Sequence, residues 1–119
     1  MVRIQNTAKP EAVSALDMQR DIRLALSLAD HAPSGPVARE VRGRLRDYIT
    51  VLEDPAGRYA TSLDTATRAR DVAVSTIRYA HDLAHDPGGD PVASLRLLAK
   101  STDCLLRYAA SAPGPKAEA

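Results

Sequence analysis

Aromatic residues are scarce in this sequence of 119 residues, which contains no Phe, no Trp and only four Tyr. Strands favour aromatic and β-branched residues, whereas Ala and Leu, which supply much of the apolar content here, favour helices. Apolar residues still make up 45% of the chain, too large a share for a disordered protein. The composition therefore favours a folded helical protein, and the length suits a single domain.

Cysteine and excess charge are also nearly absent. Cys104 is the single cysteine, which excludes an intrachain disulfide and is typical of a reducing compartment. The formal net charge of +1 lacks the basic excess usual in nucleic-acid-binding proteins. No apolar run approaches the roughly 18 residues of a membrane span, and the first residues lack an apolar segment of signal-peptide length. We therefore expect a cytoplasmic protein without membrane association, and nucleic acid is not the expected partner.

Proline and glycine cluster in short segments that divide the chain into pieces of helix length. Within the pieces, apolar residues recur at spacings of three and four, as in amphipathic helices. This pattern predicts helices over residues 11–32, 36–53, 63–85 and 91–110. Residues 1–10 are expected to be flexible and residues 111–119 to form a disordered tail. Short connections favour antiparallel neighbours, so the expected fold is all-α: an antiparallel up-down four-helix bundle with short connections rich in Pro and Gly.

Helix starts and ends carry local signals. Gly35 or Ser34 before Pro36, and Asp90 before Pro91, are typical of a cap followed by a proline in the first turn. Asp64 is the candidate cap of the third helix. The sequence DPAG at residues 54–57 is interpreted as a break that ends the second helix.

The sharpest motif is a pair of histidines, His81 and His85, four residues apart near the end of the third predicted helix. Such a pair lies on one helical face and resembles the H-E-x-x-H motif of zinc proteases, with Asp82 in place of Glu. Histidines at a helix C-terminus also interact favourably with the helix dipole, which explains them without a metal. We therefore expect no metal, no cofactor and no catalytic residue, and His81 and His85 remain the weak candidates for metal ligands.

A basic face lies on the second predicted helix. Arg39, Arg42 and Arg46 lie opposite its apolar stripe, where a phosphate or an acidic partner would dock. Acidic residues nearby balance this charge, and no aromatic residues are interleaved for stacking on bases. The ordinary interpretation is a solvated face with local ion pairs.

The first predicted helix is apolar over a wide arc. Ile22 and Ala29 belong to one stripe, whereas Leu24 and Leu28 point elsewhere. Because a large exposed apolar patch usually marks an interface, we expect a homodimer whose interface includes Leu24 and Leu28.

Two stretches resemble a known family. Residues 41–45 read VRGRL and residues 98–108 read LAKSTDCLLRY. Both are similar to segments of small all-helical actinobacterial proteins of unknown function that are often labelled natural-product biosynthesis proteins. The resemblance covers residues 41–108 and implies a setting in secondary metabolism. Arg44 and Arg107 stand where that family usually has histidines, so no role of those histidines is carried over.

From these observations we expect a non-enzymatic helical accessory or partner-binding protein in a bacterial secondary-metabolism or regulatory context. The alternative is a small-molecule binder or enzyme with a cavity between the helices, lined by Tyr48, Tyr79, Tyr108 and His81. A third interpretation is a DNA-associated regulator that uses the Arg face of the second helix.

Overall fold

The computed structural model describes residues 14–86 and 89–113. Four α-helices account for 83% of these residues, and the described part contains no strand. The helices are α1 (Ala15–His31), α2 (Pro36–Ser62), α3 (Arg68–Ala84) and α4 (Pro91–Ala110). The predicted all-α four-helix fold is confirmed. The segment expected to be flexible, 1–10, and most of the expected disordered tail, 114–119, lie outside the described residues.

Side-chain caps explain where three of the helices begin. The hydroxyl of Ser14 accepts a hydrogen bond from the backbone N–H of Asp17, and the carboxylate of Asp90 accepts one from Ala93. Such caps satisfy N–H groups that have no partner within the helix. The predicted starts at Pro36 and Pro91 are confirmed, with Gly35 and Asp90 as their N-cap residues. The predicted cap at Asp64 is wrong, because Thr67 caps α3 and the helix starts at Arg68.

The predicted end of the second helix is also wrong. Instead of stopping at residue 53, α2 continues through Pro55 to Ser62. Proline lacks the N–H that would bond to the carbonyl of Val51, and it disfavours the helical conformation of the residue before it. Packing overrides this cost, because Ala56 and Ala60 are buried and extend the apolar stripe of α2 by two turns. Helices in proteins owe most of their stability to such packing.

We expect Pro55→Ala to raise the free energy of unfolding by about 1–2 kcal/mol. Alanine restores the hydrogen bond to Val51 and removes a penalty of about 3 kcal/mol, partly offset by the greater freedom of the unfolded chain. Urea unfolding followed by circular dichroism at 222 nm measures the change. A loss of stability would contradict the prediction and show that α2 needs the proline to pack Ala56 and Ala60.

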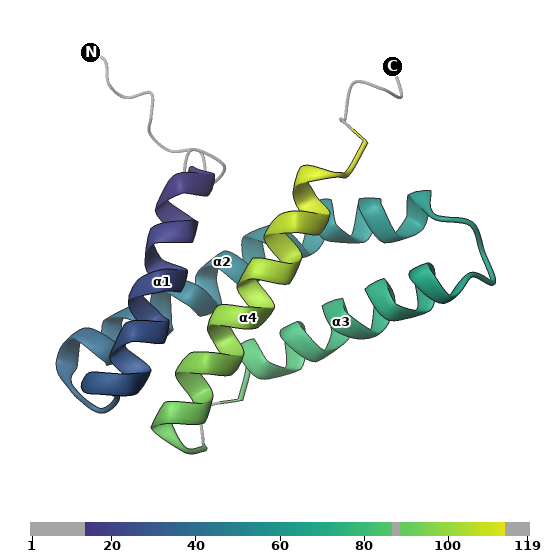
Figure 1. The fold of residues 1–119 in the computed structure, drawn as a ribbon. Coiled ribbons are helices and arrows are strands. Elements are labelled where there is room, and N and C mark those ends of the chain that lie inside the picture. The colour runs from purple at the N-terminus through teal and green to yellow at the C-terminus, as the bar shows by residue number, and fades with distance from the viewer. Residues whose placement is uncertain (1–13, 87–88, 114–119) are drawn as a thin grey trace, which may run out of the picture.

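The helices follow one another in alternating directions, and α2 and α4 form the centre of the molecule (Figure 1). Each of these two helices packs against the other and against both remaining helices. In Figure 1, α1 flanks this central pair on one side and α3 on the other. In the same view, α2 and α3 form an antiparallel hairpin, and the turn that joins them lies far from α1.

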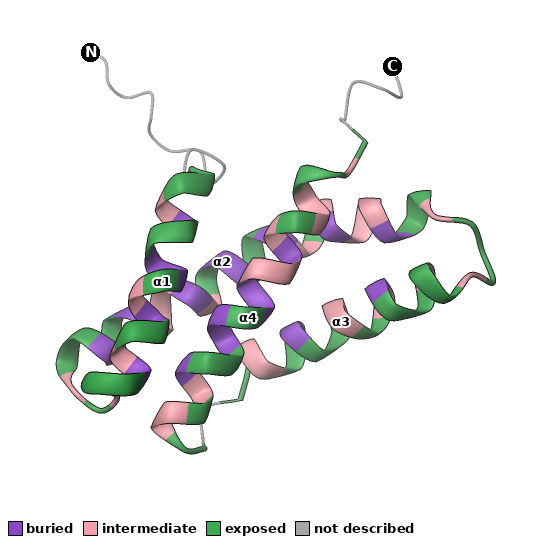
Figure 2. Ribbon diagram, viewed as in Figure 1, coloured by how far each residue is buried: buried purple, intermediate pink, exposed green. Residues whose placement is uncertain are grey.

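The core lies where α1, α2 and α4 meet, as the purple segments in Figure 2 show. Its largest fully buried side chains are Val41, Leu45, Ile49, Leu95, Leu98 and Leu105. In contrast, Ala73 and Ala80 are the two buried residues of α3. Because α3 contributes only small buried side chains, its remaining surface is free to form grooves with its neighbours.

Candidate functional site

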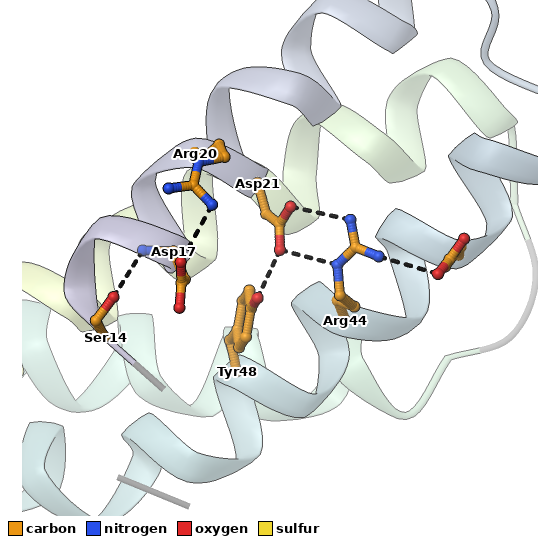
Figure 3. A network of polar contacts seen from close by, with 7 residues as sticks. Ser14, Asp17, Arg20, Asp21, Arg44 and Tyr48 are labelled. Carbon is orange, nitrogen blue, oxygen red and sulfur yellow. Dashed lines mark hydrogen bonds and ion pairs between the residues drawn. The ribbon is translucent and has the colours of Figure 1, made fainter. Parts of the chain in front are cut away.

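A buried carboxylate, Asp21, lies at the contact between α1 and α2 and is only 7% exposed. The guanidinium of Arg44 donates two hydrogen bonds to it, from Nε at 2.9 Å and from Nη2 at 3.0 Å. The hydroxyl of Tyr48 donates a third, at 2.5 Å to Oδ2. Arg44 also forms an ion pair with Glu40, at 3.2 Å. Figure 3 shows these side chains converging on Asp21 from one face of α2.

The charges in this network support one another. Burial by itself would raise the pKa of Asp21, but the hydrogen bonds from Arg44 and Tyr48 and the charge of Arg44 outweigh it and lower that pKa. Burial, together with the hydrogen bond to Asp21, raises the pKa of Tyr48 to about 12. The hydrogen bond to Asp21 raises the pKa of Arg44. Asp21 is therefore ionised and Tyr48 protonated at neutral pH.

The network acts as a structural link between α1 and α2. Asp21 and Tyr48 are both buried, and Asp21 is already bonded to two side chains of α2. The sequence interpretation missed this role, because it assigned no partner to Asp21 or Arg44 and placed Tyr48 beside a cavity. The available signal was Asp21 itself, a charged residue one turn from Met18 and from Ala25 on the buried face of α1.

An open groove runs between the C-terminal half of α2 and the middle of α3, with a volume of about 390 Å³. Its apolar lining comes from Gly57 and Ala60 of α2 and from Val74 and Ile77 of α3. A Cβ atom added at Gly57 would meet nothing within 4 Å, so the space above this glycine is empty. We call this surface the α2–α3 groove.

The groove continues over the surface of α2 into a second hollow of about 580 Å³. Glu53, Gly57 and Thr61 line both hollows and are spaced by four residues, which places them on one face of α2. Asp54 and Arg58 line the second hollow and pair with each other. The Nε of Arg58 is buried without a hydrogen-bond partner in the described part of the chain.

Polar groups lie along one edge of the α2–α3 groove. His81 donates from Nδ1 to the carboxylate of Glu53, with distances of 3.0 and 3.1 Å to its two oxygens. The guanidinium of Arg78 also lines the groove and forms no hydrogen bond or ion pair with the described residues. The hydroxyl of Thr61 donates to the carbonyl of Gly57 and so serves its own helix. The arrangement suits binding, because an apolar floor lies beside ionic groups of both signs.

The two histidines singled out from the sequence are neighbours, with ring centroids 4.3 Å apart. His85 is the C-cap residue of α3, and its Nδ1 lies 2.7 Å from the carbonyl of His81, which it caps. Within the described ranges, no group of three or more His, Cys, Asp or Glu side chains is placed to hold a metal ion. That the protein carries no metal stays a prediction.

The arginines expected on a solvated face have separate roles. Arg42 donates to the carbonyl of Pro33 and so closes the connection from α1 to α2. Arg46 donates to the carbonyl of Asp86, which ties α2 to the end of α3. Arg39 remains exposed. Arg42 and Arg46 therefore also tie segments of the fold together, and a partner or ligand surface over these three residues stays a prediction.

Two other sets of predicted residues lie differently from the expectation. Leu24 and Leu28 are partly buried and pack against the core, so they do not form the exposed patch from which a dimer through α1 was predicted. The proposed cavity-lining tyrosines are dispersed. Tyr48 is buried beside Asp21, Tyr108 stacks on Tyr59 with ring centroids 4.9 Å apart, and Tyr79 is exposed on another face of α3. No common cavity joins them with His81 among the pockets described.

Comparison with known proteins identifies the family. A model for a family of unknown function, DUF6415, matches residues 16–114, which includes all four helices except Ala15, the first residue of α1. The chain belongs to this family. No curated protein and no solved structure matches it. Over the part of the chain that the structure describes, none of the helices combines the length and the apolar character needed to cross a membrane.

Proposed function

We propose that this member of DUF6415 is a non-enzymatic accessory protein that acts by binding protein partners through the α2–α3 groove. The observation that carries this function is the groove itself, an uncovered apolar floor bordered by charged side chains. The resemblance of the chain to natural-product biosynthesis proteins, at residues 41–45 and 98–108, supports a setting in bacterial secondary metabolism. The single cysteine supports the cytoplasm as its location.

The shape of the groove suits a helix. An antiparallel helix pair presents a shallow trough in which an amphipathic helix packs its apolar stripe, a common mode of protein recognition. On another side of α2 the molecule already uses this mode, since α4 packs against α2 and stacks Tyr108 on Tyr59. The small residues Gly57 and Ala60 allow a second helix to approach α2 closely.

A second copy of this chain is the partner that the charges favour. The two joined hollows carry two carboxylates, Glu53 and Asp54, and two guanidiniums, Arg58 and Arg78. A surface whose charges cancel does not repel its own copy. In a twofold dimer, Arg78 of one copy can share the carboxylate of Glu53 or Asp54 of the other copy, although each is already paired with a side chain of its own chain. The homodimer is therefore proposed at the α2–α3 groove, in place of the α1 surface expected from the sequence.

A pair of valine variants tests this dimer. At micromolar concentration, sedimentation equilibrium should give wild-type protein twice the mass of one chain. We expect Val74→Asp to raise the dissociation constant at least about tenfold, because it places a charge on the apolar floor. Val72→Asp is the matched control, because Val72 lies on the same helix, is 49% exposed and does not line the groove.

A second pair of variants covers the case in which Val74→Asp also weakens folding. Gly57→Leu fills the groove, whereas Gly43→Leu adds the same side chain to α2 at another position with empty space around it. Both changes favour the helix, so we expect only Gly57→Leu to reduce dimerisation. Wild-type protein that stays monomeric, or control variants that dissociate as readily as the groove variants, would refute the dimer at this surface.

A further inference from the structure

A separate groove lies between α3 and α4, with a volume of about 330 Å³. Tyr79 of α3 and Leu97 of α4 line it and are among the exposed large apolar residues of the molecule. Lys100, Ser101 and Cys104 line it further along α4. The α2–α3 groove shares none of these residues, so the two surfaces are independent. We call this second surface the α3–α4 groove.

Ser101 is the unusual residue of the α3–α4 groove. It is only 6% exposed, yet its hydroxyl forms no hydrogen bond with any residue in the described ranges. Buried hydroxyls in helices commonly donate to the carbonyl four residues earlier, as neighbouring Thr102 does to Leu98 at 2.7 Å. Among the described residues, Arg58 Nε and not Ser101 Oγ is the fully buried side-chain atom without a partner, so the Ser101 hydroxyl reaches the groove and takes its hydrogen-bond partner from what fills it. Because Ser101 lines the groove, a ligand in the groove is placed to supply that partner.

The other polar groups of the α3–α4 groove indicate the sign of the ligand. No carboxylate lines it, and the ammonium group of Lys100 forms no ion pair with the described residues. The hydroxyls of Ser75 and Thr76 also line it and add donors on the α3 side. An unpaired cation beside several hydroxyls matches the acceptor oxygens of an anion, and carboxylates are bound by this combination.

The apolar groups indicate the rest of the ligand. Tyr79 and Leu97 are 49% and 38% exposed, so a ligand that covers them removes apolar surface from water. The volume of the groove is at the lower end of the range for small-molecule sites. We propose that the α3–α4 groove binds an amphipathic organic anion, whose carboxylate lies against Lys100 and Ser101 and whose aliphatic body lies against Tyr79 and Leu97.

Titration of the full-length ¹⁵N-labelled protein with octanoate tests this site. We expect saturable shifts of backbone amide signals that are concentrated at residues 75–79 and 97–104. Acetate lacks the aliphatic body and octan-1-ol lacks the charge, so both should bind at least about tenfold more weakly. Absence of saturable shifts in this groove, or equal binding of octan-1-ol, would overturn the assignment.

Ser101→Ala separates a binding role from a structural one. Because this hydroxyl reaches solvent and bonds to no described residue, its removal should leave Tm nearly unchanged, while octanoate binds about tenfold more weakly. Lys100→Met, which removes the charge but keeps a long side chain, should weaken the binding of octanoate by a similar factor. Ser27→Ala, on exposed α1 surface, is the control and should bind as wild type. Octanoate binding that neither Ser101→Ala nor Lys100→Met weakens would refute the site. Val74→Asp should leave octanoate binding unchanged, because Val74 lines the separate α2–α3 groove.

Discussion

Leu98→Ala is expected to lower the free energy of unfolding by about 2–5 kcal/mol, as deletion of a large buried side chain does in other cores. Leu98 is 0% exposed and belongs to α4, which packs against all three other helices. The loss combines the transfer of the leucine side chain with the cavity that its removal leaves, since the surrounding helices relax only in part. Urea unfolding followed by circular dichroism gives the change.

Ile77→Ala is the informative comparison. By their spacing of three and four from other apolar residues, Ile77 lies on the apolar stripe of the third predicted helix and Leu98 on that of the fourth, so the sequence alone does not distinguish them. In the structure, Ile77 is partly buried and also lines the α2–α3 groove, so its truncation should cost about 1–2 kcal/mol. Equal losses at the two positions would show that the groove is closed in solution, and a loss below about 0.5 kcal/mol at Leu98 would show that the core is assigned wrongly.

Asp21→Ala is the second large effect, with an expected loss of about 2–3 kcal/mol. The change removes the partner of Arg44 and of Tyr48 at once and leaves the buried tyrosine hydroxyl unpaired. Breaking a fully buried ion pair costs about 3–5 kcal/mol. The cost here is smaller because the side chain of Arg44 is 38% exposed, so water and Glu40 can still reach it.

Tyr48→Phe isolates one of the interactions around Asp21. It removes only the hydroxyl that donates to the carboxylate, and we expect a loss of about 1 kcal/mol. In the double variant with Asp21→Ala the two losses should not add, because both changes break the same hydrogen bond. Additive losses would show that Asp21 and Tyr48 are not coupled.

The pH dependence of stability provides a second measurement of the same network. The folded state lowers the pKa of Asp21, so its contribution is present above the ordinary aspartate pKa and is lost as the pH falls through the folded value. The folded state raises the pKa of Tyr48 to about 12, so stability declines as the pH rises from about 10 towards 12, where only the unfolded tyrosine readily ionises. Asp21→Ala should reduce the loss of unfolding free energy at acid pH, and Tyr48→Phe should reduce the loss at alkaline pH. A pH dependence of stability that is the same in the variants as in wild type would contradict the network.

The sequence by itself determined that the protein is helical and roughly where its helices lie. Apolar spacings of three and four are a local property, and so are caps such as Asp90 before Pro91; both survived in the structure. Local signals failed where packing opposed them. Pro55 and Gly57 are typical of a break, yet the buried stripe through Ala56 and Ala60 carries α2 past them.

Only the tertiary structure decided which faces meet and which stay open. The separation of Asp21 from Arg44 along the chain gives no indication that they pair, because that contact depends on how α1 crosses α2. For the same reason, Leu24 and Leu28, which were predicted to form an interface, are partly buried and pack against the core. Both grooves exist because α3 buries only Ala73 and Ala80, which leaves its flanks uncovered. A helical pattern specifies one apolar stripe per helix, whereas a groove is the space that neighbouring helices leave between them, and that space is defined only once the helices are packed.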